Sequence, residues 1–320
     1  MILSRRNFLR STALTFGASS LAPLGALAAD RTGYKALVCV FLFGGCDTKD
    51  MLIGYDQPSY DQWAAARRSI LERFDGGPDG GARGRDQLLP LNPLNSGRFG
   101  SRRFALPPEM NGVKDLFDRG AAAFVPNVGP LLEPVNRQAV EDGIALLPDR
   151  LESHNDQQST WQAFSVEGAG QGWGGNILDA MQQTSPYTAI SVTGQTVFLS
   201  GAETRQLQLA SSGQVQRAYG TNRRVYNSDE ATAILRNYYR TSADHLNNPL
   251  MRDLVRAQAK AVDDTNVLAE LLDQSSVGDS IRLDGNRLSD QLGTVADLIN
   301  VRSALDVNRQ IFFVGMGGFD

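Results

Sequence analysis

The chain has 320 residues and a formal net charge of −4, with 31 Lys or Arg against 35 Asp or Glu. This length is ample for one large domain with a buried core. The acidic balance argues against a nucleic-acid partner, because nucleic-acid binding requires a basic surface. The two cysteines, Cys39 and Cys46, are too few for a zinc site made of cysteines, and both thiols are expected to be free.

The N-terminus has the features of an export signal. Residues 4–10, SRRNFLR, match the twin-arginine pattern S-R-R-x-F-L-(K/R), residues 11–27 are weakly apolar, and residues 26–28 form an A-x-A cleavage site. A basic amphipathic first helix is the alternative. We therefore expect a signal peptide at 1–28, the twin-arginine export machinery as a partner, and a periplasmic or extracellular location.

The mature protein is expected to begin after residue 28. Loss of the signal would change the net charge from −4 to −7, because it contains three arginines and no acidic residue. Residues 29–320 are expected to form a single α/β domain. They contain no second apolar segment long enough to cross a bilayer, so no permanent membrane span is predicted.

The first fold signal is the segment 37–50, LVCVFLFGGCDTKD. Its seven leading residues are apolar, rich in Val and Phe, and closed by Gly44-Gly45. Such a run predicts a strand buried on both faces in the middle of a parallel sheet. Ligands of open α/β sheets bind beyond the carboxyl ends of the strands, which is where Asp47 lies.

Two helices and a second strand are predicted next. The segment 56–74 has helical spacing of its apolar residues, with Arg67 and Arg68 on a solvated face. Pro107-Pro108 starts a helix that ends near Gly120. The apolar run 121–128 is expected to form a second buried strand, followed by a long loop that reaches Arg150.

A further helix is predicted to begin at Ser153. Ser153 and Asp156 fit a capping box, and a helix N-terminus offers free N–H groups to an anion. Ser153 on these grounds is a helix cap, and His154 is a surface residue beside it.

The remaining segments alternate between helix and strand patterns. We expect a polar insertion or cap at 205–248, in which His245 has no assigned role. The other predicted elements are a short helix at 176–183, strands at 187–192 and 196–200, and long helices at 250–272 and 288–305.

The C-terminal segment repeats the pattern of the first strand. A short apolar run at 311–314 leads to GMGGFD, so GGCD and GGFD each place a carboxylate three residues after the first glycine of a pair. If the two strands are neighbours, Asp47 and Asp320 point into one crevice. Paired carboxylates suit a divalent metal such as zinc, calcium or magnesium. The alternative is two ordinary turns, each with a solvated Asp.

The ordered motifs resemble a known family. The twin-arginine signal, FLFGGCD, ESHNDQQSTWQ, GWGGNILD and FFVGMGGFD together resemble the DUF 1501 family of exported bacterial proteins, in the alkaline-phosphatase/sulfatase-like superfamily. The resemblance covers residues 4–320. It implies a doubly wound, mostly parallel α/β sheet, and metal-dependent hydrolysis of phosphate or sulfate esters of a small molecule or polymer.

The resemblance also assigns roles to four residues. It implies that Asp47 and Asp320 bind the metal, that Ser153 is a candidate nucleophile, and that His154 is a ligand or an acid/base.

Three departures from the family pattern weaken the hydrolase interpretation. Cys46 replaces an Asn, Asn176 stands where an Arg is usual, and the Thr-His expected after Asp320 does not follow. We therefore expect a domain incomplete at its C-terminus and a hydrolase that is inactive or incomplete as given. The alternative is a non-catalytic exported binding protein that retains the fold, which the small number of histidines, two, favours.

Overall fold

The computed structural model describes residues 33–76, 83–215, 217–221, 223–239 and 246–319. The chain forms two compact units. The first contains the described residues of Met1–Leu42 and Asp149–Gly317, and the second contains those of Phe43–Pro148 and Gly318–Asp320. The predicted signal peptide, His245 and Asp320 lie outside the described residues.

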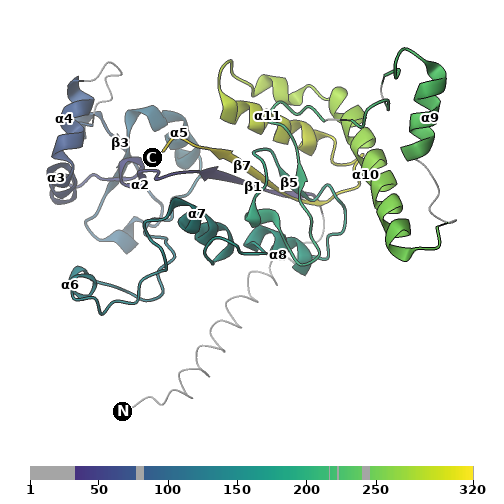
Figure 1. Ribbon diagram of the computed structural model, residues 1–320. Coiled ribbons are helices and arrows are strands. Elements are labelled where there is room, and N and C mark those ends of the chain that lie inside the picture. Colours follow the sequence, from purple (N-terminus) through teal and green to yellow (C-terminus); the bar gives the residue numbers. More distant parts are fainter. Residues whose placement is uncertain (1–32, 77–82, 216, 222, 240–245, 320) are drawn as a thin grey trace. The chain divides into compact units, whose positions relative to one another are not determined.

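The first unit is built on a parallel sheet of four strands in the order β1-β7-β5-β6 (Figure 1). The strands are β1 (Lys35–Leu42), β5 (Ala189–Ser191), β6 (Leu207–Gln208) and β7 (Arg309–Met316). A mixed α/β fold with a parallel sheet is thereby confirmed. Because β6 belongs to the sheet, the start of the predicted insertion at 205–248 is part of the sheet.

The middle of this sheet is β7 rather than β1. β1 pairs along its whole length with β7, from Lys35 opposite Arg309 to Leu42 opposite Met316, and has no second described neighbour. Leu37 and Val40 are accordingly 42% and 46% exposed. The prediction that β1 is buried on both faces was therefore wrong. The strand predicted at 311–314 is confirmed, and β7 is buried from its first residue to its seventh.

Five helices of the first unit connect or cover these strands. They are α7 (His154–Ala163), α8 (Trp173–Ala180), α9 (Asp229–Tyr239), α10 (Pro249–Asp273) and α11 (Arg287–Asn300), with short 3-10 helices η4 (Val197–Leu199) and η5 (Val277–Ser280). The two long helices predicted from apolar spacing are confirmed, although α11 ends five residues early. The helix predicted at 176–183 begins three residues earlier. The described residues include no helix long and apolar enough to cross a membrane.

The strand predicted at 196–200 was wrong, because this segment forms η4. The hydroxyl of Thr196 accepts a hydrogen bond from the Phe198 N–H at 3.2 Å, which closes a turn. β-branched residues suit strands, but here a side-chain hydrogen bond to the local backbone replaces strand pairing.

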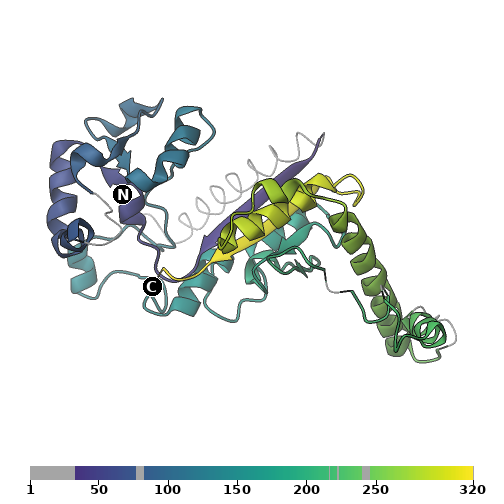
Figure 2. The ribbon, with the colours of Figure 1, turned by 90° about the horizontal axis from the view of Figure 1, so that it is seen from above.

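The core of the first unit lies between the sheet and the two long helices, and α11 lies against β7 (Figure 2). Its fully buried side chains come from both layers: Ile190, Val192, Leu268, Leu298, Phe312 and Val314. The apolar face of the amphipathic helix α11 therefore packs on one face of the central strand β7.

A buried glutamine completes the hydrogen bonding of β7 beyond the end of β5. The last residue of β7 that pairs with β5 is Phe313, so the Gly315 backbone has no strand partner on that side. Gln291 on α11 donates to the Gly315 carbonyl and accepts from the Gly315 N–H, both at 2.8 Å. The amide side chain thus substitutes for a missing strand residue.

The second unit is smaller and has a three-stranded antiparallel sheet in the order β2-β4-β3. Ile53, Leu88 and Ala105 form its buried centre. Its elements are α2 (Thr48–Met51), β2 (Ile53–Gly54), α3 (Gln57–Ala66), α4 (Arg68–Gly76), η1 (Arg85–Gln87), β3 (Leu89–Pro90), η2 (Ser96–Phe99), β4 (Phe104–Leu106), η3 (Pro108–Met110), α5 (Asn111–Asp118) and α6 (Arg137–Glu141).

Two sequence predictions fall in the second unit with opposite outcomes. The helix predicted after Pro107 is confirmed as η3 followed by α5. The strand predicted at 121–128 was wrong, since this segment has no strand pairing and Val125 is 78% exposed. An apolar run becomes a strand only where a neighbouring strand is available to pair with it.

Removal of the two hydrogen bonds between Gln291 and Gly315 should cause a large loss of stability. Gln291→Leu leaves the buried N–H and C=O of Gly315 without partners, and should lower the free energy of unfolding by about 2–4 kcal/mol. Urea unfolding measures this loss. The control, Gln258→Leu on the exposed face of α10, should change it by less than about 0.5 kcal/mol. Equal effects of the two variants would contradict the assigned role of Gln291.

Candidate functional site

The two glycine-rich loops follow adjacent parallel strands. Leu42 of β1 pairs with Met316 of β7, so both strands end at the same edge of the sheet. Beyond them, the Gly45 N–H donates to the carbonyl of Phe319 at 3.0 Å. Gly44 has a φ of 107°, a left-handed conformation in which glycine is unstrained. The sequence analysis predicted a shared crevice only if these two strands are neighbours, and the structure shows that they are.

Asp47, the predicted metal ligand of the first loop, is held by an ion pair and a helix cap. It is the N-cap of α2, and its carboxylate accepts from the Lys49 N–H at 3.1 Å. The guanidinium of Arg67 donates to the same carboxylate and lies over the ring of Trp63, with 5.6 Å between the guanidinium carbon and the ring centroid. The expectation that Arg67 is solvated was wrong, because its side chain is only 15% exposed.

The described residues do not fit a resident divalent metal. They include no group of three or more His, Cys, Asp or Glu side chains placed to hold one. Asp47 is paired with a cation, and Asp320, the second predicted ligand, lies outside the described residues. The convergence of Asp47 and Asp320 on one metal stays a prediction.

Ser153 is the N-cap of α7, as the sequence predicts. Its hydroxyl accepts from the Asp156 N–H at 3.4 Å. His154 is the first residue of the helix and is exposed. Both belong to the first unit and Asp47 to the second, so their joint participation in one site is also a prediction.

Asp156 fixes the start of α7 more firmly than the sequence indicated. The residue is 3% exposed, and its carboxylate accepts from the Glu167 N–H at 2.9 Å and from the Arg150 guanidinium at 3.4 Å. The Ser153 hydroxyl and the Glu167 N–H lower the pKa of Asp156. This carboxylate therefore ties the helix start to the segment that follows the helix.

The glycines of the GWGG motif serve packing. A Cβ on Gly172 would lie 2.2 Å from the Val197 carbonyl oxygen, and one on Gly175 would lie 2.3 Å from the Ser200 carbonyl carbon. α8 approaches the η4 segment so closely that only glycine fits at these positions. The motif thus has a structural reason that is independent of ligand binding.

The two cysteines are free, as predicted. Burial raises the pKa of Cys39 to about 11 and also raises the pKa of Cys46. The Cys46 Sγ contacts the Met51 Sδ at 3.7 Å. Both thiols therefore stay protonated at neutral pH and are poor nucleophiles.

Two cavities are lined by none of the residues described so far in this site. One, of about 450 Å³, is in the first unit between β6 and α10. The other, of about 470 Å³, is in the second unit and is lined by four phenylalanines: Phe99, Phe104, Phe117 and Phe124. Apolar residues from separate parts of the sequence line both cavities, so no local sequence motif predicts either cavity.

Comparisons with known proteins identify no relative. No family model, no curated protein and no solved structure matches this chain. Membership of the DUF 1501 family and the doubly wound form of the sheet therefore stay predictions.

The Asp156 contacts predict a pH dependence of stability. A carboxylate with a lowered pKa in the folded state stabilises the protein above its unfolded pKa of about 3.9, and this contribution is lost as the pH falls through the lower folded value. The difference in unfolding free energy between wild type and Asp156→Asn should shrink between pH 5 and pH 3. Asp149→Asn, at an exposed position, is the matched control. A difference for Asp156→Asn that is constant over this range would contradict the assignment.

Proposed function

We propose that this chain is a non-catalytic binding protein that retains an α/β fold and binds a surface partner or polymer. The observation that supports this proposal most is the state of Asp47. Its carboxylate, at the position where the family resemblance implies a metal ligand, is paired with Arg67 and a helix N–H. Each carboxylate oxygen of Asp47 thus already accepts a hydrogen bond, one from the Arg67 guanidinium and one from the Lys49 N–H.

The role of Ser153 agrees with this proposal. Its hydroxyl accepts a hydrogen bond from the Asp156 N–H and helps to lower the pKa of the Asp156 carboxyl, which agrees with a helix cap. A nucleophilic serine needs an adjacent base that accepts its proton. A carboxylate with a lowered pKa, such as that of Asp156, is a weak base.

The second candidate is a metal-dependent hydrolase of phosphate or sulfate esters, as the family resemblance implies. The observation that favours it is the adjacency of the GGCD and GGFD loops, which the β1–β7 pairing and the Gly45–Phe319 hydrogen bond support. This candidate requires ligands beyond Asp47. The described residues alone do not provide them.

Turnover and bound metal distinguish the two functions. Protein collected after export should carry no stoichiometric metal and should hydrolyse neither p-nitrophenyl phosphate nor p-nitrophenyl sulfate, with or without EDTA. Wild type and Asp47→Asn should behave alike. If turnover is found that EDTA abolishes and Asp47→Asn lowers at least a hundredfold, the hydrolase is the correct function.

We also propose that residues 1–28 direct export through the twin-arginine pathway. The motif, the apolar stretch and the cleavage site occur in the required order. The double substitution of Arg5 and Arg6 by lysine should retain the protein in the cytoplasm, as cell fractionation would show. The matched control, Arg10→Lys, keeps within the pattern and should still be exported. Export of the double variant at the wild-type level would refute the proposed pathway.

A further inference from the structure

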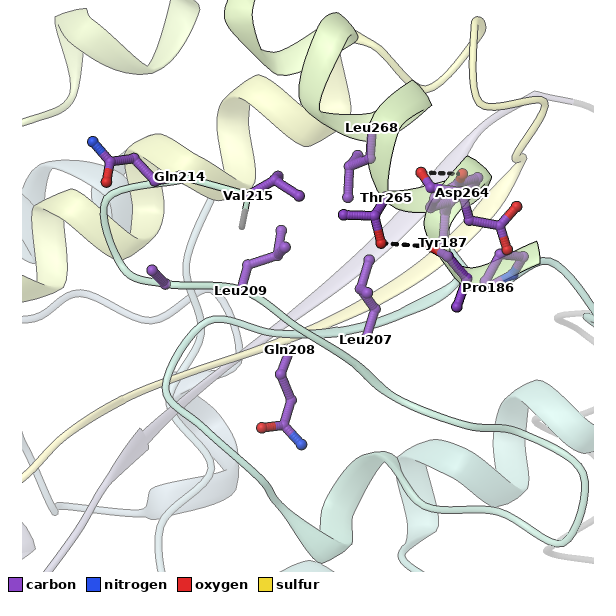
Figure 3. A pocket seen from close by; sticks show the side chains of 12 residues that line it. Pro186, Tyr187, Leu207, Gln208, Leu209, Gln214, Val215, Asp264, Thr265 and Leu268 are labelled. Atoms are coloured by element: carbon purple, nitrogen blue, oxygen red, sulfur yellow. Dashed lines mark hydrogen bonds between the residues drawn. The ribbon is translucent and has the colours of Figure 1, made fainter. Parts of the chain in front are cut away.

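The cavity of about 450 Å³ in the first unit has a defined position (Figure 3). One wall is α10. The other walls are the residues before β5, β6 with the residues after it, and the segment at 214–215. All of the lining residues belong to one unit, and none of them takes part in the loops at the ends of β1 and β7. The cavity is therefore a feature separate from the site considered above.

Its walls are mainly aliphatic. The side chains of Leu207, Leu209, Val215 and Leu268 surround the space, whereas Gln208 extends away from them (Figure 3). Leu207 and Leu209, on either side of Gln208, both line the cavity, as expected of side chains that alternate along extended chain. Binding pockets for small molecules have volumes of about 300–1,000 Å³ and are mostly apolar, and a cavity of about 150 Å³ already holds benzene.

The polar groups of the cavity are few and carry no free cation. The Tyr187 hydroxyl donates to the backbone carbonyl of Asp264 at 2.9 Å, and burial together with the Asp264 charge raises the pKa of Tyr187 to about 12. Thr265 Oγ1 donates to the Ala261 carbonyl at 2.6 Å, which leaves its oxygen lone pairs as acceptors. Asp264 is the one acidic residue of the lining, and its carboxylate pairs with Lys260.

We propose that this cavity binds a small, uncharged aliphatic molecule that carries a hydroxyl group. The aliphatic walls exclude water from the ligand's hydrocarbon part, and the Thr265 oxygen in the lining has lone pairs that can accept a hydrogen bond from its hydroxyl. An anion such as a fatty-acid carboxylate is disfavoured, because the lining contains no Lys, Arg or His side chain that could pair with it. The ligand class is thus an aliphatic alcohol.

Fluorescence of N-phenyl-1-naphthylamine, a neutral apolar probe, tests the proposal on the full mature chain. Saturable enhancement with about one site per chain is expected. Ala261→Trp, at an exposed position in the cavity lining, should fill the space and weaken probe binding at least tenfold. The matched control, Ala257→Trp, lies one turn earlier on α10 outside the lining and should bind as wild type. Circular dichroism confirms that both variants are folded.

Competition tests the ligand class. 1-Decanol should displace the probe at concentrations at least tenfold lower than decanoate does. Thr265→Val, which preserves shape and removes the acceptor, should retain probe binding and weaken displacement by decanol several-fold. Any of four results would overturn the proposal. Two concern binding, namely that the probe shows no saturable binding or that the two tryptophan variants bind it equally. Two concern competition, namely that decanol and decanoate displace the probe equally or that displacement by decanol is unchanged in Thr265→Val.

Discussion

The structure depends on the pairing of β7 with strands on both of its sides. β1 is in register with β7 over eight residue pairs, and β5 pairs with its middle. Buried amide side chains extend this pairing: Gln291 binds Gly315 near one end, and Gln310 binds the Tyr187 carbonyl near the other. Because an unpaired polar group inside a protein is costly, these contacts determine which strands can be neighbours. They also place the ends of β1 and β7 at one edge.

The motif around Asp47 indicates a metal ligand, whereas its surroundings in the structure indicate a helix cap and an ion-pair partner. Its position after a strand and a glycine pair is typical of a ligand-binding carboxylate, yet here it caps α2 and pairs with Arg67. Its side chain is 47% exposed, and an exposed ion pair contributes only about 0–1 kcal/mol. The pair with Arg67 therefore disfavours a metal at Asp47 only in combination with the set of ligands around it. A stable metal centre needs further ligands, and the described residues do not supply them.

The sequence predicted the elements that local periodicity determines. Apolar spacing identified α10 and α11, and the capping pattern identified the start of α7 at Ser153. It failed where the outcome depends on distant partners. The run at 121–128 is as apolar as a strand but has no neighbouring strand to pair with. β1 lies at an edge of the sheet, and the apolarity of a single strand does not determine its place in the strand order.

The same limit applies to the candidate site. The sequence placed Asp47 correctly after β1 and Ser153 at a helix N-terminus. It did not foresee Arg67 as the partner of Asp47, since the two are twenty residues apart and meet only through the packing of α3. The sequence also did not predict the cavity beside α10, because its lining residues Tyr187, Leu209 and Leu268 come from three separate segments.

Metal-linked stability tests the central proposal, that Asp47 anchors Arg67 and the start of α2 instead of holding a metal. A ligand that binds only the folded state raises the unfolding free energy by RT ln(1 + [L]/Kd), so 1 mM metal at a Kd of 10 μM would add about 2.7 kcal/mol. Urea unfolding of the mature chain should give the same midpoint with EDTA and with 1 mM zinc, calcium or magnesium. A rise in the midpoint with one of these metals, abolished by Asp47→Asn, would contradict the account.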